Sequence, residues 1–231
     1  TYQDLRFNGE LQKESLSGNF SIKDENINII INGIANWSKE NTRLDITAHL
    51  KDFCPNAIHL TDKYPNLTLD ASANISLSTY GKHWIDNLTG HIIIDSLNVQ
   101  NGSKQAIMEQ MKLLVDNDIK NKKKHHRLQL QSDFVTANIS GIFQYTTLLN
   151  TAQRIIHGYV PSLVTAPKKI NRQPNELSFY AYFRQLETIS EVLDLEVSLP
   201  HYPTIKGYID EQKEALELQA YIPNINTDGT N

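Results

Sequence analysis

Residues 132–163, SDFVTANISGIFQYTTLLNTAQRIIHGYVPSL, contain a strand pattern that leads directly into a helix pattern. In the strand part, apolar positions alternate with mostly polar ones from Val135 through Ile139 to Phe143. A period of two residues places one set of side chains on one face of a sheet. This part therefore predicts a strand with a single apolar face.

The second part of the segment has helical spacing. Its apolar residues recur at intervals of three and four and form one stripe of an amphipathic helix: Leu148, Leu149, Ala152, Ile155, Ile156 and Tyr159. Thr146 or Thr147 can cap the start of this helix, and Pro161 fits its end. The stripe needs a cover, and we expect the apolar face of the sheet to provide it.

The strand pattern recurs along most of the chain, and its longest example runs from Leu67 to Ser78. At the usual rise per residue this run spans ~40 Å. We expect the apolar face of the whole sheet to include these positions: Leu67, Leu69, Ala71, Ala73, Ile75, Leu77, Ile92, Ile94, Ile139, Phe143, Leu177, Phe179, Phe183, Ile205 and Ile209. The fold class is therefore mainly β, with a long antiparallel sheet.

Glycines are placed regularly within these runs. Six of the 10 glycines have an apolar residue two positions away on each side: Gly9, Gly18, Gly33, Gly90, Gly141 and Gly207. Glycine on the apolar face of a strand permits a bend, and repetition across strands would curve the sheet. The alternative is that these are ordinary strand glycines.

Short segments interrupt the strands. We expect short helices at Asn56–Lys63, His83–Asn87 and Thr188–Leu195. The basic run Lys120–Arg127 is either a solvated hairpin tip or a contact for an anion or a lipid headgroup. His125 and His126 are adjacent, so on a strand they point to opposite faces and cannot bind one metal together.

Composition restricts the function classes. The 231 residues carry a net charge of −4 and are 39% apolar, which gives no tendency toward nucleic acid or anionic membranes. No apolar run is long enough to span a bilayer. The single cysteine, Cys54, excludes an internal disulfide. Because the chain does not begin with Met, we expect a fragment of a longer protein.

No pattern of catalytic chemistry emerges from the sequence. There is no nucleophile elbow, phosphate loop or dinucleotide fingerprint, and Cys54 and His59 lack partners at a zinc spacing. We therefore expect no enzyme, catalytic residue, metal or cofactor. An apolar sheet face without a second sheet would instead be a ligand groove or an interface. Acyl chains suit such a face, because each buried CH₂ contributes ~0.8 kcal/mol without polar partners.

Several blocks resemble one protein family. The segment LQSDFVTANISGIFQYTTLLNTAQRIIHGYVPSLV resembles a part of the TamB proteins of Bacteroidota, in which a strand with Gly-x-Phe leads into a helix ending in Tyr-x-Pro. The blocks HLTDKYPNLTLDASANISLSTYG and WIDNLTGHIIIDSLNVQNG are similar to the preceding part of those proteins. NELSFYAYFRQLETISEVL and LPHYPTIKGYIDEQKEALELQAYIP resemble the following part. The resemblance extends from about Asp4 to Pro223.

The resemblance implies an AsmA-like protein that crosses the periplasm and is anchored in the inner membrane by an N-terminal helix outside this chain. It implies a U-shaped apolar groove with a few short helices packed on it. On this basis residues 1–223 form one repetitive β-groove segment, and residues 224–231 are a polar tail expected to be disordered. The resemblance also implies a BamA-like outer-membrane barrel as partner, through regions outside this chain.

Two function classes fit these features. The first is a bridge-like conduit for phospholipids between the inner and outer membranes. The second is a scaffold that assists the insertion of outer-membrane proteins by offering a sheet edge to their strands. Apolar side chains that face a wet groove favour the first, and a long unprotected edge strand favours the second.

Overall fold

The computed structural model describes residues 4–38, 40–159, 174–184, 186–194, 197–198, 202–221 and 226–227. Its main feature is a single 13-stranded sheet in which every pair is antiparallel, so the expected mainly β class is confirmed. The order is β1-β2-β3-β4-β5-β6-β8-β9-β10-β11-β13-β14, and β7 pairs with β6 beside this path. The sheet does not close on itself, because β1 and β14 are its edges.

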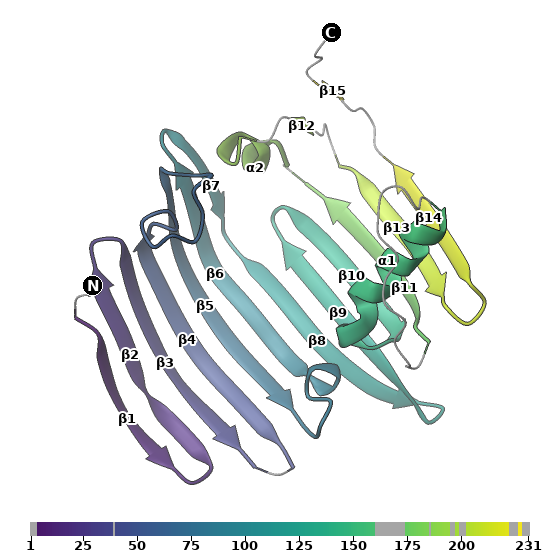
Figure 1. Cartoon of the computed structure of the whole chain (residues 1–231), viewed down its shortest axis with the longest axis horizontal. Helices are drawn as coiled ribbons and strands as arrows, with labels where there is room; N and C mark the ends of the chain where they lie inside the picture. Colours follow the sequence, from purple (N-terminus) through teal and green to yellow (C-terminus); the bar gives the residue numbers. More distant parts are fainter. Residues whose placement is uncertain are drawn as a thin grey trace.

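The strands of the sheet follow one another along the chain. Their bounds are β1 Arg6–Gln12, β2 Ser15–Asp24, β3 Ile27–Trp37, β4 Thr42–Phe53, β5 Leu67–Thr79, β6 Thr89–Asn101, β7 Lys104–Met108, β8 Met111–Lys120, β9 Lys123–Ser132, β10 Val135–Ile142, β11 Glu176–Phe183, β13 Thr204–Asp210 and β14 Ala215–Tyr221. Figure 1 shows them side by side as a single layer of long, curved strands. The sheet is long because each alternating run pairs with the run that follows it.

Helical segments are few and short. They are the 3₁₀ turns η1, Ile85–Asn87, and η2, Tyr145–Thr147, and the helices α1, Leu148–Tyr159, and α2, Leu186–Val192. The expected main helix after Phe143 is therefore present as α1. In Figure 1, α1 lies in front of the strands near β10, β11 and β13, and α2 lies beside β7.

Some local predictions need correction. Residues 56–63 form turns and not a helix, because backbone bonds such as His59 N to Asn56 O close single turns and His59 has a positive φ of 61°. The segment expected to be helical at 83–87 is reduced to the 3₁₀ turn η1. Only Asn121 and Lys122 of the basic run form the hairpin tip, and both have positive φ, whereas Lys120 ends β8 and the residues from Lys123 to Arg127 belong to β9.

The end of the chain adds one small pair of strands. β15, Asn226–Thr227, pairs with β12, Val197–Ser198, in a separate two-stranded sheet. The β15 residues, Asn226–Thr227, belong to the segment 224–231, for which we expected disorder. The other residues of that segment lie outside the described part of the chain.

Two β-bulges change which side chains of the longest strands point to each face of the sheet. The register of β5 with β6 shifts between Ser72 and Ala73, so that Ile94 and Leu97 both face the same way as β5 residues Ala73 and Ala71. A second shift lies in β4 before Phe53. Each bulge adds residues to one strand and restores the alternation beyond it.

Glycines permit close approach of neighbouring strands at the expected positions. Gly141 has a φ of 151°, and a Cβ added to it would lie 2.2 Å from the backbone oxygen of Glu176. At Gly90, with a φ of 128°, an added Cβ would lie 2.1 Å from the oxygen of Ser76. Only glycine fits both conditions, which favours a bending role here over that of an ordinary strand glycine.

Candidate functional site: the apolar face of the sheet

One face of the sheet carries apolar side chains from edge to edge. Directly paired residues of neighbouring strands point to the same face, so the register defines rows across the sheet. One such row passes through Ile22, Ile29, Leu50, Ala71, Leu97 and Met108. Another passes through Ile75, Ile92, Leu113, Leu130, Ala137, Ala181, Ile205 and Ala220.

The positions predicted from the sequence lie together on this face. The alternation of β5 places Leu67 through Leu77 on it, and the register adds Ile92, Ile94, Ile139, Leu177, Phe179, Phe183, Ile205 and Ile209. Phe143 follows β10 with the same alternation, and its ring lies 5.2 Å from the ring of His126, which pairs with Gly141 on this face. Whether any of them contacts lipid stays a prediction.

Along most of the apolar face the side chains are partly exposed. Ala73, Ile75 and Ile92 at the middle of the sheet are only partly buried. At the β1 edge the exposed fractions of Phe7 and Leu11 reach 57% and 72%. An apolar surface of this extent on a protein marks a place where something else binds.

The opposite face is mostly polar, although Ile30, Ile34 and Ile93 also point to it, and its polar side chains are hydrogen-bonded to one another across β2–β6. Asn19 donates to Asn32 at 2.7 Å, and Ser76 donates to Asp45 at 2.7 Å. Thr47 donates to Asn74, which in turn donates to Asp95. Because these polar groups have partners within the sheet, this face needs no ligand to satisfy them.

At one end of the apolar face, α2 closes over β6 and β7. Val192 of α2 is only 2% exposed and lies in one cluster with Ala106, Met108 and Phe134. Asn101 of β6 donates to the Val192 backbone oxygen at 2.9 Å. Lys104 of β7 forms an ion pair with Asp194 just after α2.

At the opposite end, the η1 and η2 turns meet. The Thr146 backbone N–H donates to Asp86 at 3.2 Å, and the Thr146 hydroxyl donates to the same carboxylate. Asp86 is 7% exposed. These bonds join the segment between β5 and β6 to the segment that follows β10.

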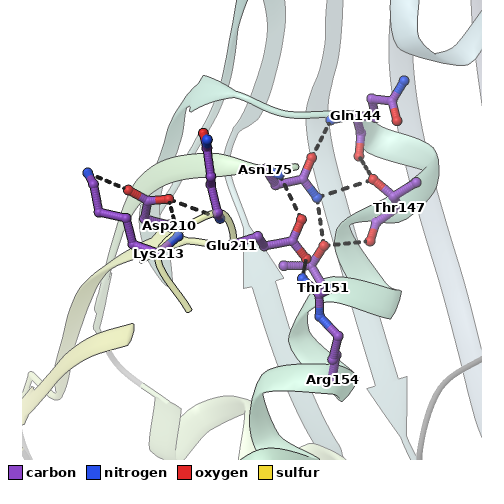
Figure 2. Close-up of polar contacts among 9 residues, drawn as sticks. Gln144, Thr147, Thr151, Arg154, Asn175, Asp210, Glu211 and Lys213 are labelled. Carbon is purple, nitrogen blue, oxygen red and sulfur yellow. Dashed lines mark hydrogen bonds and ion pairs between the residues drawn. The ribbon is translucent and has the colours of Figure 1, made fainter. Parts of the chain in front are cut away.

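Asn175 links the start of α1 to the strands beside it (Figure 2). Its side chain accepts from the Gln144 N–H at 3.1 Å and donates to the hydroxyls of Thr147 and Thr151 at 3.2 and 2.6 Å. Asn175 and Thr151 are each 1% exposed. The network therefore holds the first turns of α1 at the beginning of β11.

The same network reaches the turn between β13 and β14. The Asn175 backbone N–H donates to Glu211 at 2.7 Å, and Arg154 of α1 forms an ion pair with Glu211 (Figure 2). The Arg154 side chain lies off the predicted apolar stripe of α1 and is 52% exposed, but it is paired. This contact fastens α1 to the sheet near β13.

His126 occupies a polar position on the apolar face. It pairs with Asn117 and Gly141, whereas His125 pairs with Asp118 on the other face, so the prediction of opposite faces is confirmed. The His126 ring lies 5.0 Å from the ring of Tyr145. Burial lowers the pKa of His126 to about 4 and raises the pKa of Tyr145 to about 12. Both side chains are therefore neutral at pH 7.

The apolar stripe predicted for α1 is only partly described. The side chain of Leu148 is half-buried, while those of Leu149, Ala152, Ile155, Ile156 and Tyr159 lie outside the described side chains. The expectation that this stripe covers the groove therefore stays a prediction.

Chemical groups for catalysis or metal binding are scarce on this surface. Among the described residues, no group of three or more His, Cys, Asp or Glu side chains could hold a metal ion. None of the described helices combines the length and apolar character that a membrane span requires. The arrangement therefore offers a broad apolar contact surface. Polar contacts hold the connecting segments in place at its two ends.

A comparison with protein-family models, curated proteins and solved structures finds no match to this chain. The functional interpretation therefore depends on the geometry above and on the resemblance of the sequence blocks.

The polar contacts around the start of α1 were not predicted from the sequence. Asn175, Asp86 and Glu211 are polar residues in turns and connecting segments, and each finds its partner far away in the chain. The only signal was local: Thr146 and Thr147 stand where a helix cap belongs, and Thr147 does accept a bond from Asn175.

Proposed function

We propose that this chain is a segment of a periplasmic lipid-transport protein, in which the apolar sheet face carries phospholipid acyl chains between the inner and outer membranes. The observation that supports it is the apolar face that continues from β1 to β14 and remains partly exposed along its middle. Acyl chains need no hydrogen-bond partner, so such a face can hold them at any point along its length.

In this proposal the sheet curves into a U-shaped groove, with glycines such as Gly90 and Gly141 at its bends and short helices packed on the groove. The polar face, with its internal hydrogen bonds, faces the periplasm. The resemblance also implies an inner-membrane anchor and a BamA-like barrel as partner of the whole protein.

Ala73 offers a direct test at the centre of the apolar face. It pairs with Ala48 and Ile94, and its alternation partner Ser72 points to the polar face. We expect Ala73→Asp to reduce the phospholipid that is extracted with the purified chain and detected by mass spectrometry. Ser72→Asp is the matched control and should leave bound lipid unchanged. Equal lipid content in the two variants would contradict the proposal.

A second candidate function is a scaffold for strands of outer-membrane proteins. The observation that favours it is β1, an edge strand whose residues are all exposed. An exposed edge offers backbone groups to a further strand. A photoreactive residue at Asn8 should then capture protein, whereas one at Ala73 should capture lipid if the chain is a conduit. The dominant product distinguishes the two functions.

A further inference from the structure

A pocket with only apolar lining lies beneath α2. Its volume is about 200 Å³, and it is lined by Leu97, Val99, Ala106, Met108, Phe134, Val192 and Leu193. We call it the α2 pocket. No polar or charged side chain contributes to its lining, so it offers nothing to bind a headgroup, a sugar or an ion.

The walls of the α2 pocket are held in place by packing and by polar contacts outside it. Ala106, Met108 and Phe134 are 6%, 6% and 8% exposed. α2 is held from outside the pocket by Asn101, which donates to the Val192 oxygen, and by the ion pair of Lys104 with Asp194. The pocket is therefore part of the fold and not a gap between loosely placed segments.

The α2 pocket is continuous with the open apolar face. Leu97 pairs with Ala71, and Val99 pairs with Leu69, both on the apolar face of β5. The bulge between Ile94 and Leu97 is what brings Leu97 back to this face. The register therefore places only apolar side chains between Leu69 and Ala71 of β5 and the Leu97 and Val99 wall of the pocket.

The size of the pocket limits what it can hold. An apolar cavity of about 150 Å³ in a protein holds benzene, so about 200 Å³ accommodates roughly six to eight carbon atoms. A whole acyl chain is longer than this, and a headgroup is excluded by the lining. Only the methyl end of an acyl chain is both small enough for the volume and apolar enough for the lining.

We propose that the α2 pocket binds the methyl end of an acyl chain whose remainder lies on the apolar face of β5 and β6. This inference rests on the proposed lipid-carrying function and adds a fixed position and a fixed direction for the bound acyl chain. The chain end is buried beneath α2, and the headgroup points away from it along the strands.

The first test locates the chain end. In the full chain carrying Trp37→Phe and Trp84→Phe, Glu191→Trp places a single tryptophan at an exposed position of α2, beside the pocket and outside its lining. Stearic acid with a nitroxide at carbon 16 should quench this tryptophan at least about threefold more than stearic acid with the nitroxide at carbon 5. Equal quenching, or stronger quenching by carbon 5, would overturn the inference.

The second test fills the pocket. Ala106→Leu adds three carbon atoms to its wall, so it should weaken binding of an 18-carbon fatty acid on the order of tenfold and that of a 10-carbon fatty acid far less. Ala215→Leu, the same substitution at a position of β14 that pairs with Asp210 on the opposite face of the sheet, is the matched control and should change neither affinity. Circular dichroism and calorimetric titration report folding and binding for both variants.

The outcomes of these tests distinguish a failure of the pocket assignment from a failure of the proposed function. If the unmodified chain binds no fatty acid in the titration, the proposed function fails and the inference fails with it. If it binds fatty acid but Ala106→Leu folds and binds all chain lengths unchanged, only the pocket assignment is overturned. If Ala106→Leu does not fold, the quenching ratio at Glu191→Trp decides alone.

Discussion

Strands β1–β5 and strands β6–β11 have the same alternation of side chains but differ in how their apolar face ends. In β1–β5 the face stays open, and Ile27 and Leu67 are its buried apolar side chains among the described residues. The other buried apolar residues and all the buried polar ones, such as Asp86, His126 and Asn175, lie outside β1–β5 among the described residues, and many of them lie beneath α2 or around the start of α1. The strands thus create the apolar face, and the connecting segments decide where it is covered.

The largest loss of stability is expected for a substitution of Gly141, at the bend between β10 and β11 in the covered part of the sheet. Gly141→Ala would place a Cβ 2.2 Å from the Glu176 oxygen and 2.6 Å from the Leu177 Cα, at a φ of 151°. Because backbone atoms cannot move aside without breaking the β10–β11 pairing, we expect a loss of about 4 kcal/mol in the free energy of unfolding. Urea unfolding measures it.

Gly33→Ala is the control in the open part. Its added Cβ would meet the Asp45 oxygen at 2.8 Å and the movable Ile46 side chain at 2.9 Å. We expect it to cost about 1 kcal/mol, since the contacts are longer and φ is not positive. A larger loss for Gly33→Ala than for Gly141→Ala would contradict the assignment of the tighter bend to the covered part.

The next effect concerns the network that holds α1. Asn175→Ala removes the partner of the Gln144 N–H and the donor to Thr147 and Thr151, all at a buried position. We expect about 3 kcal/mol of destabilisation, because buried polar groups lose their hydrogen bonds. Asn19→Ala removes one exposed bond to Asn32 in the open part and should cost less than about 0.5 kcal/mol. Similar losses for the two variants would refute a special role of the buried network.

The free energy of unfolding should also depend on pH through His126, a buried residue of the covered part of the sheet. The pKa of His126 is lowered to about 4 from an ordinary 6.5, so the unfolded chain binds more protons than the folded chain between these pH values. Stability therefore falls as the pH falls through this window, by about 2 kcal/mol between pH 7 and pH 5. His126→Gln should remove this contribution, as shown by unfolding curves at both pH values.

His49→Gln provides the comparison for that pH effect. His49 lies on the polar face of β4, is exposed and is hydrogen-bonded to Ser72. The variant should retain the acid destabilisation of the unmodified chain. If His126→Gln retains it too, the buried histidine is not its source.

The smallest effect is expected at the ion pair that fastens α2. Lys104 and Asp194 are 48% and 60% exposed and join segments far apart in the chain. Lys104→Ala should cost less than about 1 kcal/mol, because exposed ion pairs contribute little. Arg43→Ala breaks a pair within a single strand, Arg43 with Asp45, and should leave the unfolding midpoint unchanged. A loss of several kcal/mol for Lys104→Ala would show that α2 depends on this pair more than on Val192.

Much of this architecture follows from local sequence. Alternation alone predicted the antiparallel strands and the shared face of residues such as Leu69, Ala73 and Ile75, because a period of two leaves no other way to gather apolar side chains. The change to helical spacing after Phe143 predicted α1 for the same reason. The glycine pattern pointed to Gly90 and Gly141, where close backbone approach excludes any side chain.

Only the tertiary structure decided how the apolar face is interrupted. The bulge that returns Leu97 to the face depends on pairing with Ala71, and alternation within β6 does not reveal it. The contacts of Asp86 with Thr146 and of Asn175 with Thr151 join segments 60 and 24 residues apart, so no local pattern marks them. The α2 pocket likewise requires Val192 to lie over Ala106 and Met108. Local periodicity determines which side chains share a face, whereas long-range packing determines which of them are covered, because burial depends on partners that the neighbouring sequence does not specify.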